Sequence, residues 1–266
     1  MPDRLAPIDT LTVASLNLHH GFDSNGTPFG VTAAVCELDA AIICVQEVWQ
    51  PFAAGSASEP EVPDQLADAA GKLGMSLHRA VMCVRPGFAS QDDTARDRLS
   101  QDDTGQDDTG GNSGELSVAV LTTLPVTNYR VIELGTARGD IIPRLAQVVF
   151  LELPRGGMLR LVNTHLTHRF TSPLQLQQLQ RQLQPGPPTI IVGDLNMPRI
   201  IAASWPGYAD MVRGRTYPAG RPLIQLDHML ASRGIERVSG RVLRPAGSDH
   251  LPIRAEFRVP GAGRSS

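Results

Sequence analysis

The sequence has few cysteines, and their spacing excludes the usual cysteine-based architectures. It contains three cysteines in 266 residues, and no two of them form a CxxC pair. An odd number without that spacing argues against a disulfide framework and against a cysteine zinc site. Free cysteines are typical of a reducing compartment, so we expect a cytoplasmic protein.

Long apolar runs, aromatic residues and an excess of charge are also missing. No apolar run is long enough to cross a bilayer, and the N-terminal segment MPDRLAPIDT has no apolar signal core. The net charge is −3, without the basic excess that a dedicated duplex-DNA binder usually shows. Aromatic residues make up 5% of the chain, so stacking platforms for single strands are not evident. We expect no membrane span and no obligate protein partner.

Short apolar segments are what the chain does contain. Those rich in Val, Ile and Leu predict buried strands at 11–18, 40–48, 115–123, 146–153, 158–166, 188–196, 225–232 and 251–259. Helices are predicted at 31–38, 63–74 and 172–183, the last with Ser172 as N-cap and Pro173 as its first helical residue. Strands mixed with helices, some strands following each other directly, predict a layered α/β or α+β fold.

One stretch has almost nothing to bury. The unit QDDT occurs at 91–94, 101–104 and 106–109, within a polar and acidic segment. This composition predicts a disordered loop at about 89–113. Its carboxylates could bind metal loosely, but a solvated insertion at a tolerant loop is the favoured interpretation. With flexible tails at 1–10 and 260–266, we expect a single domain over residues 11–259.

Polar side chains recur at the C-terminal ends of the predicted strands, where Asp227 and His228 follow IQL, and one pair, Asp249 with His250, precedes the last strand. They are Asn17, Glu47, His165, Asp194 with Asn196, Asp227 with His228, and Asp249 with His250. A carboxylate at the end of a buried apolar run is costly unless it is paired or binds a metal. One such residue is usually a cap or a turn former, but a set of six places beside apolar runs indicates a shared site.

The residue types at these places suggest a reaction. Oxygen ligands such as Asp, Glu and Asn favour hard cations like Mg²⁺ or Mn²⁺ over zinc. A hard cation beside His and Asp suits displacement at phosphorus, because the metal neutralises phosphate charge while a His–Asp pair moves protons. We therefore expect a divalent-metal-dependent phosphoesterase.

Six short segments contain these residues: SLNL at 15–18, CVQEV at 44–48, VNTHL at 162–166, VGDLN at 192–196, QLDHML at 225–230 and SDHLPI at 248–253. In this order they resemble the endonuclease/exonuclease/phosphatase superfamily, which includes pancreatic-type deoxyribonuclease, abasic-site endonucleases, bacterial sphingomyelinases and inositol-polyphosphate 5-phosphatases. These segments cover most of the chain except the QDDT stretch and the tails. The resemblance implies a four-layered α/β sandwich, with two mixed sheets face to face, helices outside and the site at one edge.

The resemblance implies a metal site. Glu47 matches the principal metal carboxylate of the family, and Asn17 matches the Asn that helps to bind the metal or the phosphate. Asp249 resembles a second carboxylate on the metal side. The implied cofactor is Mg²⁺, with Mn²⁺ as the alternative.

Four further matches imply the reaction itself. Asp194 matches the aspartate that orients or deprotonates the attacking water. Asn196, two residues on, is expected on the same face of an extended segment, where it can donate to the phosphate. His250 resembles the essential histidine, a general base or a stabiliser of the pentacovalent phosphorus, and Asp227 resembles the buried aspartate that holds its ring.

The resemblance also indicates which residues contact the phosphate and which substrate class is favoured. His165 matches a histidine that contacts a non-bridging phosphate oxygen, and Arg144 is a weaker candidate, balanced against a surface arginine. His19 stands where abasic-site endonucleases carry Asp, and His165 where they commonly carry Tyr. The departure at His165 favours the deoxyribonuclease, sphingomyelinase and phosphatase side of the family, and the one at His19 weakens the repair-enzyme interpretation and leaves the metal site less acidic. His168 and His228 have no assigned role, and packing accounts for His228.

We expect hydrolysis of a phosphodiester by water attack, as in a nuclease, with nucleic acid as one candidate substrate. The first alternative is a small-molecule or lipid-headgroup phosphatase or phosphodiesterase, similar to a sphingomyelinase or an inositol phosphatase. The second, from another class, is a catalytically inactive binding module of the same fold. The occupied acidic and His positions count against that module.

Overall fold

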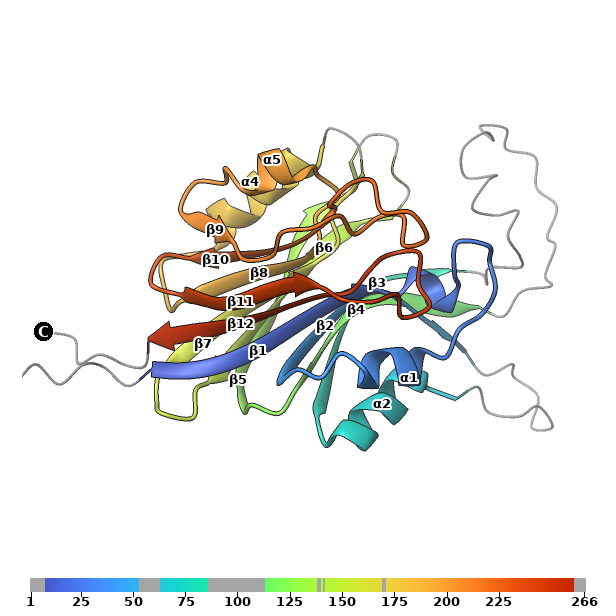
Figure 1. Ribbon diagram of the computed structural model, residues 1–266, viewed down its shortest axis with the longest axis horizontal. Helices are drawn as coiled ribbons and strands as arrows, with labels where there is room; N and C mark the ends of the chain where they lie inside the picture. Colours follow the sequence, from blue (N-terminus) through green and yellow to red (C-terminus); the bar gives the residue numbers. More distant parts are fainter. Residues whose placement is uncertain are drawn as a thin grey trace, which may run out of the picture.

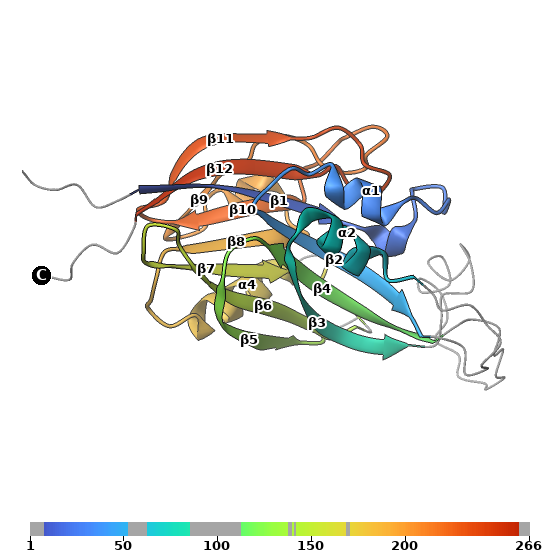
Figure 2. The ribbon, with the colours of Figure 1, turned by 90° about the horizontal axis from the view of Figure 1, so that it is seen from below.

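Two mixed six-stranded sheets pack face to face in the computed structural model, and helices lie on their outer faces (Figures 1 and 2). The structure describes residues 8–52, 63–85, 113–137, 140, 142–168 and 171–260. The predicted four-layered α/β sandwich is confirmed. The predicted QDDT loop, apart from Ser113, lies outside the described residues.

The first sheet has the order β11-β12-β1-β2-β4-β3. Its strands are β1 (Ile8–Asn17), β2 (Ile42–Pro51), β3 (Ser76–Arg85), β4 (Gly114–Thr122), β11 (Glu236–Val242) and β12 (Ile253–Pro260). β1 and β2 run parallel, and the other neighbours are antiparallel. Residues 8–10 and 260, which we expected in the tails, belong to the paired ends of β1 and β12.

The second sheet has the order β5-β6-β7-β8-β10-β9. Its strands are β5 (Val126–Gly135), β6 (Arg144–Glu152), β7 (Met158–Thr164), β8 (Thr189–Asp194), β9 (Tyr208–Asp210) and β10 (Asp227–Ser232). Only β7 and β8 run parallel among the neighbours of this sheet in the described chain. All eight predicted strands are present, and β3, β5, β9 and β11 are additional.

The helices flank the two sheets on opposite sides (Figure 1). They are α1 (Val31–Cys36), α2 (Gln65–Leu73), α4 (Ser172–Gln182), the short α5 (Arg199–Ala202) and a 3-10 turn, η1 (His19–Gly21). The three predicted helices are confirmed, but the predicted cap of α4 is wrong by one residue. Thr171 is the N-cap, and Ser172 is the first helical residue, whose hydroxyl donates to the carbonyl of Asn196 at 3.1 Å instead of capping the helix.

The central strands are buried on both faces. In β1, Val13 packs into the core between the sheets, whereas its neighbour Ala14 packs into the layer under α1 and α2. In β2, Cys44 likewise packs into the core between the sheets and Ile43 into the layer under α1 and α2. Cys44 is a fully buried core residue, as expected. Burial on both faces explains why these strands appear in the sequence as continuous apolar runs.

Two expectations from composition concern the whole chain. All three cysteines lie in the described part of the chain, and none of them forms a disulfide there. Among the described residues, no helix combines the length and the apolar character needed to cross a membrane.

Candidate active site

Strand ends from both sheets meet at one edge of the sandwich. The parallel pairs β1–β2 and β7–β8 direct their carboxyl ends to this edge. β10 runs antiparallel to β8, so its first residue, Asp227, lies opposite Asp194, the last residue of β8. Asp227 therefore begins a strand and does not follow one, which corrects the sequence-based interpretation. The antiparallel register brings it to the edge nonetheless.

A cleft of about 430 Å³ opens at this edge. Seven of the nine predicted site residues line it: Glu47, Arg144, His165, Asp194, Asn196, Asp249 and His250. The other two lie directly behind it, in contact with lining residues. Asn17 donates from Nδ2 to Glu47 Oε1 at 2.9 Å and to Asp194 Oδ2 at 3.1 Å, and Asp227 is bonded to His250. The structure thus brings all nine together.

Glu47 owes its position to an irregularity in β2. The pairing register of β2 with β4 shifts between Val45 and Val48, and Glu47 itself has a φ of 51°. Such bulges re-aim a side chain that a regular strand would direct elsewhere. Oε2 of Glu47 lies 3.4 Å from His20 Nε2. Burial opposes ionisation of Glu47, but the charge of His20 and the Asn17 hydrogen bond hold its pKa below the ordinary range.

Asp194 is fixed by hydrogen bonds to both of its carboxylate oxygens. Oδ1 accepts from the backbone N–H of Asn196 at 2.9 Å, and Oδ2 accepts from Asn17. Asn196 has a φ of 49°, so the segment turns after β8 and is not extended as we expected. The turn, not strand alternation, brings the two side chains together. Burial and the nearby charges of Asp227 and Glu47 raise the pKa of Asp194.

His165 is buried between Glu47 and Asn196. Asn196 Nδ2 lies 3.0 Å from His165 Nε2 and also donates to the carbonyl of Leu166 at 2.9 Å. An amide nitrogen can only donate, so Nε2 of His165 accepts and Nδ1 carries the proton. Nδ1 is buried without a hydrogen-bond partner, 3.6 Å from Glu47 Oε1. Burial and the charge of Arg144 lower the pKa of His165 to about 3, which makes it neutral at pH 7.

His250 and Asp227 form a buried ion pair. His250 Nδ1 lies 2.9 Å from Asp227 Oδ2, and His250 Nε2 lies 3.7 Å from Asp194 Oδ2. Burial favours the neutral ring, but Asp227, Asp194 and Asp249 together raise the pKa of His250 to about 10. In return, the His250 charge and hydrogen bond hold the pKa of Asp227 below its usual value despite burial. His250 is therefore an imidazolium at neutral pH.

Asp249 and Arg144 complete the charged lining. Asp249 Oδ1 lies 3.7 Å from His19 Nδ1, and burial together with the charge of Glu47 raises the Asp249 pKa. Arg144 is 4% exposed and donates from Nε to Asp140 Oδ2 at 3.0 Å. Thr167 donates to the same oxygen at 2.8 Å. Arg144 is thus a held, buried residue of the cleft and not a surface arginine.

Three lining residues with polar side chains had no role in the sequence analysis. His20 could have been noticed from its place beside SLNL, and His168 follows the VNTHL segment. Tyr217 comes from a loop without a sequence signal, and its ring lies 4.8 Å from that of His250. His228, by contrast, is fully buried and its Nε2 lies 2.9 Å from the carbonyl of Met197, in agreement with a packing role.

Comparisons with known proteins agree with this architecture. The family model for the endonuclease/exonuclease/phosphatase family matches residues 12–250. The crystal structure of an endonuclease/exonuclease/phosphatase from Beutenbergia cavernae is similar with a TM-score of 0.70 and 18% identity, over 96% of this chain and 73% of that chain. The human Nocturnin catalytic domain is similar with a TM-score of 0.63 and 17% identity, over 96% and 97% of the two chains.

A third solved structure, humanized D. rerio TDP2, is similar with a TM-score of 0.59 and 14% identity, over 93% of this chain and 98% of that chain. No curated protein matches the sequence. These solved structures establish the fold alone, whereas the family model spans most of the chain and both sheets. The chain therefore belongs to the endonuclease/exonuclease/phosphatase family, whose members are usually hydrolases of phosphoesters.

Proposed function

We propose that this chain is a divalent-metal-dependent phosphodiesterase that hydrolyses its substrate by direct attack of water. One observation carries the proposal. A raised-pKa aspartate, Asp194, lies 3.7 Å from the charged ring of His250, in a cleft that also contains the carboxylates of Glu47 and Asp249. A base, an acid and a cation site in one cleft are the parts that phosphoester hydrolysis requires.

Glu47 and Asp249 are the groups that would hold the cation. They line the same cleft, and the negative charge of Glu47 contributes to the raised pKa of Asp249. A bound cation would relieve this repulsion between the two carboxylates. Two carboxylates favour Mg²⁺ or Mn²⁺. Asn17 points its amide nitrogen at Glu47 while its oxygen accepts from His19 N–H at 2.9 Å, so we assign it to holding the carboxylate. When bound, the cation would neutralise charge on the phosphate.

Asp194 is the proposed acceptor of the water proton. Its two hydrogen bonds, from Asn17 and from the Asn196 backbone, fix the carboxylate at the end of β8. A fixed carboxylate can orient a water molecule for in-line attack without further ordering. Its raised pKa makes it a stronger base than an ordinary aspartate.

His250 is the proposed donor toward the phosphoryl group. Its Nδ1 proton is engaged by Asp227, so the ring is held in one orientation with its Nε2 proton facing the cleft lining. An imidazolium held this way stabilises negative charge that develops on phosphate oxygens. Asp227 acts as a positioning residue because it is bonded to the ring of His250 and does not itself line the cleft.

Phosphate oxygens would be bound by Arg144, and by Asn196 once one of its amide protons turns from His165 to the ligand. Arg144 uses Nε on Asp140, which leaves its two terminal amino groups for an anion. His165 and Asn196 are bonded to each other, so they form one unit of the lining. Because the proton of neutral His165 is on Nδ1 and faces Glu47, His165 would act on the phosphate through Asn196, whose amide it orients.

The test is hydrolysis of bis-p-nitrophenyl phosphate by the purified chain with Mg²⁺ or Mn²⁺, with EDTA as the control. We expect metal-dependent release of p-nitrophenol, and a loss of roughly 100-fold or more in Asp194→Asn and His250→Ala. Asp210→Asn is the matched control, because Asp210 is a buried acid of the same sheet that does not line the cleft. Unchanged turnover in either site variant would contradict the catalytic role assigned to that residue.

Two alternatives are outcomes of the same experiment. The active protein is assayed in parallel against plasmid DNA, an abasic oligonucleotide, sphingomyelin and inositol phosphates. Exclusive turnover of the last two would replace the nuclease-like assignment by a lipid-headgroup or small-molecule phosphatase. No turnover with any divalent metal, together with tight binding of a partner, would leave an inactive binding module.

A further inference from the structure

A second pocket adjoins the cleft and is absent from the proposed chemistry. It has a volume of about 270 Å³ and shares two lining residues with the cleft, His20 and Glu47. A group attached to a phosphate near Glu47 could therefore enter it without crossing another layer of the protein. The pocket and the cleft are therefore neighbours with His20 and Glu47 in the lining of both.

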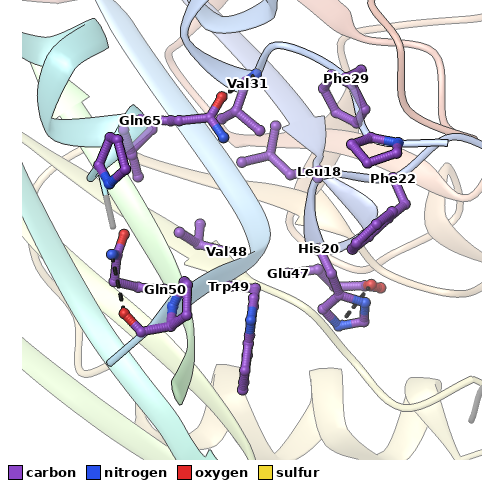
Figure 3. A pocket seen from close by; sticks show the side chains of 15 residues that line it. Leu18, His20, Phe22, Phe29, Val31, Glu47, Val48, Trp49, Gln50 and Gln65 are labelled. Atoms are coloured by element: carbon purple, nitrogen blue, oxygen red, sulfur yellow. Dashed lines mark hydrogen bonds and ion pairs between the residues drawn. The ribbon is translucent and has the colours of Figure 1, made fainter. Parts of the chain in front are cut away.

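The walls of this pocket are apolar and aromatic. Figure 3 shows Phe22, Phe29 and His20 along one side, Gln50 and Gln65 along the other, and Trp49 below them. Glu47 is the only carboxylate of the described lining, and no Lys or Arg belongs to it. The lining therefore does not suit a second phosphate. A volume below the usual range for ligand pockets fits a single ring better than a long acyl chain.

Two of the aromatic rings are seated against glycines. A Cβ atom on Gly114 would lie 2.5 Å from Cζ2 of Trp49, and one on Gly247 would lie 2.5 Å from Cγ of Phe29. Each ring thus occupies the space that a side chain at the glycine position would fill. Rings packed directly on backbone are held in place before a ligand arrives, which lowers the entropy lost on binding.

The pocket also offers a directed hydrogen-bond donor. Gln65 Oε1 accepts from the backbone N–H of Val31 at 2.9 Å, at the start of α1. This bond orients the amide, and Figure 3 shows its nitrogen on the pocket side. An aromatic wall with one amide donor can recognise a planar ring that carries an acceptor.

We propose that this aromatic pocket binds a planar ring of the phosphoester substrate, so that the enzyme prefers esters of aromatic alcohols or nucleosides over aliphatic esters. The proposal rests on the proposed function, because the cleft must hold the phosphate of that same molecule. The ring stacks on Phe22 and Trp49, and Gln65 contacts its edge. A nucleobase and an aryl group share this chemistry.

The experiment uses the two tryptophans of the chain. In Trp205→Phe, Trp49 is the sole tryptophan, and its fluorescence is titrated with inorganic phosphate, methyl phosphate, phenyl phosphate and thymidine 5′-phosphate. We expect phenyl phosphate to bind roughly tenfold or more tightly than methyl phosphate and to change Trp49 emission. Tighter binding of thymidine 5′-phosphate than of phenyl phosphate identifies a nucleobase, and the reverse identifies an aryl group.

Two variants test whether the aromatic side chains of the pocket cause the preference for an aromatic ester. Phe22→Ala removes a half-exposed ring that belongs to none of the core clusters, so the fold should persist. It should remove the preference for phenyl over methyl phosphate. Trp49→Ala, titrated by calorimetry beside Trp205→Ala as the matched control, should do the same. Equal binding of the two phosphates by the unaltered pocket would overturn the proposal. Because binding needs no turnover, this failure is distinct from a failure of the proposed hydrolysis.

Discussion

Backbone strain is concentrated at the candidate site. Five non-glycine residues of the described chain have positive φ, and four of them, His19, His20, Glu47 and Asn196, lie in or beside the cleft. Each costs on the order of 1–3 kcal/mol relative to an ordinary conformation. The surrounding hydrogen bonds hold these residues in place, such as Asn17 to Glu47 and Asn196 to His165. Side chains aimed by strain are typical of functional sites.

The pH dependence of activity should report the ion pair of His250 and Asp227. If protonated His250 is required, activity is lost as the pH rises through the His250 pKa, which the neighbouring carboxylates raise to about 10. Asp227→Asn removes the nearest negative charge. We expect the alkaline limb of kcat/KM to move to lower pH by roughly one to three units.

The control for this shift is Asp210→Asn, which removes another buried acid beside a histidine, His228, at 3.9 Å. That variant should leave the alkaline limb in place. An unmoved limb in Asp227→Asn would show that the pair does not set the pH dependence, and would remove Asp227 from the assigned machinery.

At the scale of elements, the four strands that sequence patterns did not predict are the four edges of the two sheets. They are β3, β5, β9 and β11. Edge strands lack a neighbour on one side and are partly exposed, as the mostly exposed β11 shows. Their sequences therefore lack the apolar runs that marked the inner strands. Pairing partners, not local composition, make them strands.

β7 and β8 lie so close together at Gly193, the residue before Asp194, that no side chain fits at that position. Gly193 has a φ of 137°, and a Cβ there would lie 2.0 Å from the carbonyl oxygen of Thr164. We expect Gly193→Ala to lower the free energy of unfolding by more than about 1 kcal/mol and to impair activity through the adjacent Asp194. Urea unfolding and the hydrolysis assay measure both effects.

Gly71→Ala is the matched control, since Gly71 lies in α2 with nothing near its missing Cβ. It should stabilise the protein by up to about 1 kcal/mol, because alanine is the better helix former. A stability of Gly193→Ala equal to that of the parent would mean that the two strands can separate without cost.

At the scale of the molecule, a buried polar group joins the two sheets beneath the cleft. Asn163 on β7 accepts from Gln46 of β2 at 2.8 Å and donates to the carbonyl of Ala119 on β4 at 2.9 Å. Gln147 on β6, beside it, donates to the carbonyl of His78 on β3 at 2.7 Å. These bonds fix the register of one sheet against the other, and hence Glu47 against Asp194. Apolar packing alone does not supply that specificity.

We expect Asn163→Ala to lower the free energy of unfolding by about 2–4 kcal/mol, because it leaves several buried partners without hydrogen bonds. Urea unfolding measures this change. Asn128→Ala, at an exposed position on β5, is the control and should change stability by less than about 0.5 kcal/mol. Equal stabilities of the two variants would contradict a role for Asn163 in joining the sheets.

The sequence by itself determined the inner strands and the order of the site segments. Val13 and Cys44 lie in strands buried on both faces, and such burial leaves a continuous apolar run that can be read locally. Polar residues beside those runs, such as Glu47 and Asp194, stood out because an unpaired buried carboxylate is costly.

Only the tertiary structure decided what depends on contacts between distant segments. It placed Asp227 opposite Asp194, brought the ring of Tyr217 onto His250, and made His165 neutral through burial. The aromatic pocket was likewise hidden, because its walls come from the segment between η1 and α1, from β2 and from the start of α2. Protonation states and pocket shapes arise from neighbours in space, which the chain acquires only when the two sheets pack.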